Sequence, residues 1–117
     1  MKIKDILEIV DGKEIYVDDP STYDIDFKNA FGTDLMSDAL CHLIDADETE
    51  LLITGLANMQ IFNTANTLDI AAVLIVRGKP IDEYMIKGAK ENHVSIFTTH
   101  YTMYETCGRL YEKGLGR

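Results

Sequence analysis

The sequence contains few of the residues that build disulfide frameworks, metal centres or flexible linkers. Among its 117 residues are two cysteines, two prolines and no tryptophan. Cys41 and Cys107 lie far apart, outside any metal-ligand spacing, and each falls on the apolar stripe of a predicted helix, where a free thiol behaves as a small hydrophobe. We expect core positions for both, with a disulfide or ligand role as the alternative. The lack of low-complexity runs predicts a single domain over residues 1–117.

Basic residues are scarce as well. Eleven lysines and arginines stand against twenty acidic residues, which gives a net charge of −9. An acidic surface repels nucleic-acid phosphates and anionic lipid headgroups, so neither nucleic acid nor a membrane is expected as a partner. The same charge does not oppose a small anion held in a local pocket.

Long apolar segments are missing. No apolar signal-peptide core follows the start of the chain, and the longest stretch of low charge, residues 51–76, contains Gln60, Asp69 and three asparagines. These polar residues exclude a membrane span. We expect a cytoplasmic protein.

The signatures of common catalytic centres do not occur. There is no Gly-x-Gly-x-x-Gly after a strand, no Gly-x-x-x-x-Gly-Lys-Ser/Thr loop and no Gly-x-Ser-x-Gly elbow. His42, His93 and His100 are scattered and lack the paired spacing of a zinc site. We therefore expect no catalytic residue, no metal and no cofactor.

Hydrophobic periodicity is strong, and its pattern is typical of an α/β domain. In the C-terminal half, apolar strands at 51–53, 71–76 and 94–97 alternate with helices that begin near Asn58, Asp82 and Thr102. Short connections between such elements imply parallel strands joined by right-handed crossovers. The run at 71–76 is apolar on both faces, which is typical of a central strand covered on both sides.

The N-terminal half adds further elements. A helix over residues 3–10 is predicted to end at Gly12 in a left-handed cap, and a short strand follows at 14–17. A second strand is expected from residue 24 towards Phe31. Thr33 then caps a helix whose apolar stripe is formed by the pairs Leu35/Met36, Ala39/Leu40 and Leu43/Ile44. The whole pattern predicts a three-layer α/β/α sandwich with a mixed, mostly parallel sheet of about five strands.

One helix is unusual because it has no charge. The eighteen residues between Glu50 and Asp69 are all uncharged, and Met59 and Phe62 lie among polar neutral residues of the helix from Asn58 to Leu68. Loss of charge together with Met and aromatic residues is typical of an interface core. We expect a homodimer through this helix; the alternative is a neutral, solvated helix.

The clearest candidate for a binding site is the edge where parallel strands end. In open α/β sheets, ligands bind beyond the carboxyl ends of the strands, and loops that open helices offer free backbone N–H groups to an anion. The sequence places small, polar and two basic residues there. The predicted anion site consists of Thr54, Gly55, Asn58, Arg77, Gly78, Lys79, Thr98 and Thr99. The alternative is that the glycines only form turns and the two cations are solvated.

Several short runs together resemble the DRTGG domain family. They are GTDLMSDAL at 32–40, ITG at 53–55, VRGK at 76–79, IFTT at 96–99, and Tyr104 with GRLY at 108–111. The likeness covers nearly the whole chain, although the Asp-Arg pair and the second glycine of the family name are absent here. That family resembles the N-terminal domain of HPr kinase/phosphorylase, an α/β/α sandwich. Its members occur fused to CBS domains and to phosphotransacetylases, or alone.

Two functions follow as hypotheses. The resemblance implies a non-catalytic regulatory or ligand-sensing module, often dimeric, that binds a small nucleotide- or phosphate-like anion, a partner protein, or both. The alternative is a small enzyme that uses Thr98, Thr99 and His100 at the sheet edge.

Overall fold

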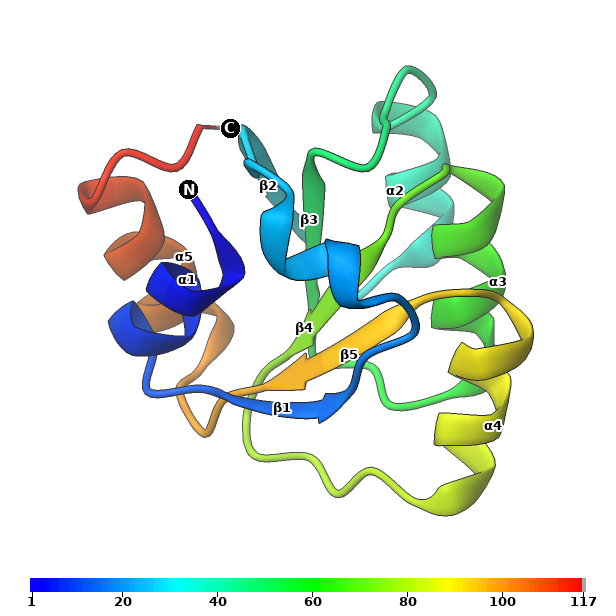
Figure 1. Ribbon diagram of the computed structural model, residues 1–117. Helices are drawn as coiled ribbons and strands as arrows, with labels where there is room; N and C mark the ends of the chain where they lie inside the picture. Colours follow the sequence, from blue (N-terminus) through cyan, green and yellow to red (C-terminus); the bar gives the residue numbers. More distant parts are fainter. Residues whose placement is uncertain (117) are drawn as a thin grey trace.

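The fold is built on one five-stranded sheet, shown in Figure 1, a computed structural model that describes residues 1–116. The elements in chain order are α1 (Ile3–Ile9), β1 (Lys13–Tyr16), the 3₁₀ helix η1 (Pro20–Asp24), β2 (Asn29–Gly32), α2 (Met36–His42), β3 (Glu50–Thr54), α3 (Met59–Thr67), β4 (Ala72–Ile75), α4 (Glu83–Glu91), β5 (Ser95–Thr98) and α5 (Met103–Glu112).

The strand order is β1-β5-β4-β3-β2, with β2 to β5 parallel and β1 antiparallel to β5. Helices α2, α3 and α4 lie on one face of the sheet and α1 and α5 on the other (Figure 1). The order from β2 to β5 never reverses, so crossovers of one hand place all three connecting helices on the same face. The predicted three-layer sandwich with a mixed, mostly parallel sheet is confirmed.

The core lies in two layers on either side of the sheet. Strands β3 and β4 are buried along their full length, because helices cover both faces of the sheet and neither face of these strands is open to solvent. Two apolar clusters result, one under α2, α3 and α4 and one under α1 and α5. Among residues 1–116 no helix has the length and apolar character that crossing a membrane requires.

Some predicted boundaries in the N-terminal half were wrong. The left-handed position after α1 is Asp11, with φ of 50°, and not Gly12. The second strand starts at Asn29, because residues 20–24 instead form η1, which the Asp19 side chain caps by accepting from the Ser21 N–H. The N-cap of α2 is Leu35 and not Thr33. The Thr33 hydroxyl accepts the Leu35 N–H, in the turn before the helix begins.

The buried stripe of α2 is narrower than predicted. Met36, Ala39 and Leu43 are buried, whereas the neighbouring Leu35, Leu40 and Ile44 are exposed. In each predicted pair one residue is thus buried and the other exposed, because α2 is a short helix that packs mainly against α3. The cysteines also differ from expectation. Cys41 is exposed, and Cys107 is half-buried with its thiol pKa raised by that burial.

The uncharged helix is buried more deeply than its sequence suggests. Phe62 has no exposed surface and Met59 is partly buried, since α3 lies between α2 and α4 and touches both. Gly88 on α4 lets the two helices come close, because a side chain there would collide with Met59. The Met and aromatic residues that motivated a dimer surface therefore belong to the core. Homodimer formation through residues 58–68 stays a prediction that rests on exposed polar residues alone.

Candidate functional site

Three loops leave the sheet side by side at its C-terminal edge. Thr54 of β3 is in register with Ile75 of β4, and Ile75 is in register with Thr98 of β5. The loops that follow these strands contain most of the predicted anion site. The structure divides those residues into two groups with different surroundings.

In the first group, a carboxylate of the protein itself occupies the anion-binding groups. Asp34, which follows β2, accepts the Gly55 N–H at 2.7 Å through Oδ1, and its Oδ2 accepts from Arg77 Nη2 at 3.1 Å. The Arg77 guanidinium lies so close over Gly55 that any side chain there would collide with it. Two donors of the predicted anion site, the Gly55 N–H and the Arg77 guanidinium, therefore lie close together, and the Asp34 carboxylate already binds both.

The ionisation of Asp34 reflects these contacts. Partial burial by itself raises the pKa of this carboxyl, but the Gly55 N–H, the Arg77 guanidinium and the Thr54 hydroxyl together outweigh the burial and hold the pKa below its usual value. The charged form of Asp34 is therefore favoured by the folded state. Because both partners are more than a third exposed, solvent screening keeps this contribution small.

We expect the Asp34 contact to make stability depend on acid pH. A carboxyl whose pKa falls on folding stabilises the protein above its unfolded pKa of 3.8 and loses that effect as pH drops through the lower folded value. Wild-type protein should thus lose more stability than Asp34→Asn between about pH 5 and pH 3. Urea titrations at several pH values measure this. Parallel pH profiles for the two proteins would contradict it.

The loop after β4 uses its first amides for structure. Arg77 and Gly78 both have positive φ, 67° and 62°, and their N–H groups donate to Tyr101 O at 2.8 Å and Thr99 O at 3.0 Å. These bonds join the β4–α4 loop to the β5–α5 loop. The two amides are therefore not free to bind an anion.

The second group lines a cavity of about 650 Å³ between β1 and the loops after β4 and β5, here called the edge pocket. Four residues of the predicted site line it, namely Gly78, Lys79, Thr98 and Thr99, and so does His100. The remaining contributors include Asp11, Gly12 and Lys13. Sequence reasoning missed these three because only the antiparallel pairing of β1 with β5, which sets Lys13 opposite Thr98, brings them here.

The edge pocket is lined by two lysines and by one acidic residue, Asp11. Lys13 and Lys79 line it, and within residues 1–116 neither forms an ion pair. His100 Nε2 lies 3.0 Å from Asp11 Oδ2, and both side chains are largely exposed. In a chain with net charge −9, two unpaired lysines at one pocket form a local attraction for an anion.

Three residues of the predicted site, Thr99 among them, have mainly structural surroundings. The Thr99 hydroxyl donates to Val10 O at 2.6 Å and accepts the Tyr101 N–H, so both of its roles are taken. Thr54 is fully buried and accepts the Leu56 N–H. Asn58 stands at the N-cap of α3 without a side-chain hydrogen bond there. Among the described residues, no group of three or more His, Cys, Asp or Glu side chains could hold a metal ion.

Comparison with known proteins gives a structural likeness only. No family model and no curated protein matches the sequence. Among solved structures, the chain is similar to the CBS and DRTGG domains of the regulatory region of Clostridium perfringens pyrophosphatase, crystallised with its activator diadenosine tetraphosphate. The TM-score is 0.72 at 17% identity, over 98% of this chain and 47% of that one. This chain thus spans about half the length of its neighbour. The likeness shows the fold and is consistent with a DRTGG-like domain.

Proposed function

We propose that the chain is a non-catalytic regulatory module that binds a small anionic ligand of nucleotide or phosphate type in the edge pocket. The observation that carries the proposal is the convergence of Lys13 and Lys79, both without an ionic partner, with His100 at the C-terminal edge of the sheet. Ligand occupancy would be read by a partner protein or by another domain of the same assembly.

The size and position of the edge pocket support this function. Its volume of about 650 Å³ falls in the range of small-molecule sites, roughly 300–1,000 Å³. Ligands of open α/β sheets bind beyond the carboxyl ends of the strands, where this pocket lies. The structural neighbour is a regulatory region that was crystallised with a nucleotide activator. Its role supports regulation for this chain in the same general sense.

The alternative of a small enzyme at Thr98, Thr99 and His100 has weaker support. A nucleophilic hydroxyl needs a base that takes its proton, but the Thr99 hydroxyl already donates to Val10 O. The His100 imidazole contacts Asp11, and both side chains are largely exposed, so the pair does not lie in an enclosed site that excludes water. The geometry favours binding over chemistry.

Thermal shift with pyrophosphate, ATP and inorganic phosphate tests the function. A ligand present at 100 times its dissociation constant stabilises by about 2.7 kcal/mol, and for a domain of this size the melting temperature should rise by roughly 10 °C. Pyrophosphate and ATP should act more strongly than phosphate, because they present more charge to the two lysines. No shift with any of the three would refute anion binding, and phosphate release from ATP or pyrophosphate by the pure protein would refute the non-catalytic role.

A further inference from the structure

The two helix layers of the sandwich are unequal. Helices α2, α3 and α4 cover one face of the sheet, and α1 and α5, with the short 3₁₀ helix η1 beside α1, cover the other (Figure 1). On that face the edge strand β2 contributes the small residues Ala30 and Gly32. A cavity of about 730 Å³, here called the α5 groove, opens between this strand and the outer side of α5.

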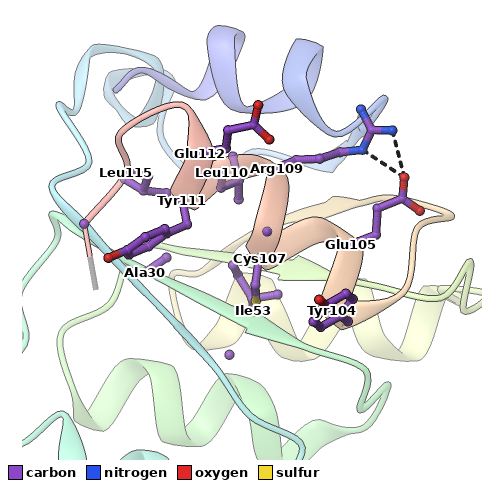
Figure 2. A pocket seen from close by; sticks show the side chains of 13 residues that line it. Ala30, Ile53, Tyr104, Glu105, Cys107, Arg109, Leu110, Tyr111, Glu112 and Leu115 are labelled. Atoms are coloured by element: carbon purple, nitrogen blue, oxygen red, sulfur yellow. Dashed lines mark hydrogen bonds and ion pairs between the residues drawn. The ribbon is translucent and has the colours of Figure 1, made fainter.

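The α5 groove is lined mainly by apolar and aromatic side chains, together with three charged residues of α5, Glu105, Arg109 and Glu112. Figure 2 shows Tyr104 and Tyr111 towards the two ends of α5, with Cys107 between them near Ile53. Tyr104 is 90% exposed and Tyr111 is 74% exposed. Large rings left in water beside an apolar groove are typical of an interaction surface.

Gly108 lies on the same side of α5, and no close neighbour among residues 1–116 requires a glycine there. A glycine inside a helix costs about 1 kcal/mol relative to alanine. Elsewhere close packing explains the cost: a side chain at Gly32 would meet Cys107 Sγ at 2.9 Å, and one at Gly88 would collide with Met59. At Gly108 a Cβ would meet nothing within 4 Å. Without a side chain, Gly108 leaves a notch on the helix surface that a residue of another protein molecule can enter.

The residues of this stripe have the same order of side-chain sizes in both directions along α5. Tyr104, Cys107, Gly108 and Tyr111 recur at helical spacing, and the order of sizes is large, small, small, large. When two such helices run antiparallel with the axis between Cys107 and Gly108, each tyrosine faces the other tyrosine of its partner and the small residues face each other. A surface with both projections and a notch, related by a two-fold axis, is what an isologous contact needs.

The charges of α5 also suit a second copy. Helix α5 and the residue after it contain two acidic side chains, Glu105 and Glu112, and two basic ones, Arg109 and Lys113, so the sum of charges along the helix is zero in a chain of net charge −9. Arg109 Nε donates to Glu105 at 2.9 Å, which neutralises that pair within the helix. Two copies therefore approach at α5 without the repulsion that the acidic surface imposes elsewhere.

We propose that the chain forms a two-fold homodimer in which α5 of a second copy lies antiparallel against α5 along the α5 groove. The partner helix then extends the helix layer over the edge strand β2, and the notch at Gly108 lets the two backbones come close. This surface lies on the opposite face of the sheet from α3, and the proposal does not depend on the anion site.

Sedimentation velocity at micromolar concentration tests the dimer with paired variants. Wild-type protein should sediment as a dimer, and Gly108→Arg and Tyr104→Glu should each convert it to monomer. The matched controls place the same charges on the other face: Asn63→Arg on α3 and Tyr84→Glu on α4 should leave the dimer intact. All four positions are exposed, so melting temperatures should stay near that of wild type, and circular dichroism checks this.

A cross-link tests the antiparallel register independently. In a Cys41→Ser background, Gly108→Cys places a thiol opposite Cys107 of the partner subunit, and mild oxidation should yield a reducible dimer. The same background with Tyr84→Cys should stay monomeric on a denaturing gel. The proposal is overturned if wild type is a monomer, if Gly108→Arg remains dimeric, or if Asn63→Arg dissociates the dimer in its place. A monomeric wild-type protein would mean that the α5 groove binds another partner. Dissociation by Asn63→Arg would assign the dimer contact to α3.

Discussion

The double variant Lys13→Ala/Lys79→Ala is expected to bind pyrophosphate about 100-fold more weakly than wild type, with an unchanged melting temperature in the absence of ligand. A hydrogen bond to a charged group contributes about 1.5–3 kcal/mol, and the loss of two such contacts at the low end of that range corresponds to about 100-fold in affinity. Both side chains lack an ionic partner among the described residues, so their removal leaves no charge unpaired. Isothermal titration calorimetry measures the change.

The matched control removes the same charge elsewhere. Lys87→Ala/Lys90→Ala alters exposed residues of α4 outside the edge pocket. If net charge alone attracted the ligand, this variant would weaken binding as much as the first, and the edge pocket would not be the site. A third variant, Arg77→Ala, should reduce stability slightly because it leaves Asp34 without its ionic partner.

Phe62→Glu is expected to prevent folding altogether. Truncation of a buried phenylalanine costs about 3–5 kcal/mol, and an unpaired carboxylate in the same place costs more. A domain has only about 5–15 kcal/mol of stability to lose. Phe62 is fully buried in the apolar cluster under α2, α3 and α4. Circular dichroism and one-dimensional NMR spectra should show an unfolded chain.

The adjacent residue supplies the comparison. Asn63→Glu introduces the same carboxylate on the exposed side of α3 and should fold with a melting temperature close to that of wild type. A folded, monomeric Phe62→Glu variant would instead mean that Phe62 lies at a surface, as the charge-free sequence first suggested.

Much of the architecture follows from local sequence. Apolar runs flanked by turn residues predict β3, β4 and β5, because strands covered on both faces have no polar side. Helix starts are also local. Residues 102–105 have the Thr-x-x-Glu pattern of a capping box, and the Thr102 hydroxyl accepts the Glu105 N–H as that pattern predicts. The Glu105 side chain, however, pairs with Arg109 instead of returning to the cap. Alternating strands and helices with short connections fix a parallel sheet and its crossovers.

Burial was harder to predict, since periodicity indicates one buried stripe and says nothing of neighbours. Helix α3 has helices on both sides and buries Phe62 in addition to its stripe. Helix α2 packs mainly against α3, and Leu35, Leu40 and Ile44 remain exposed.

The candidate site shows the same division. Sequence alone brought Gly78, Lys79, Thr98 and Thr99 to one edge, because the carboxyl ends of parallel strands meet there. It could not show that Asp34, 43 residues before Arg77, occupies the Arg77 and Gly55 donors, or that Lys13 completes the edge pocket. Those contacts depend on which strands are neighbours: β2 beside β3, and β1 antiparallel to β5. Strand order is set by the packing of whole layers, a property of the folded chain that no single segment encodes.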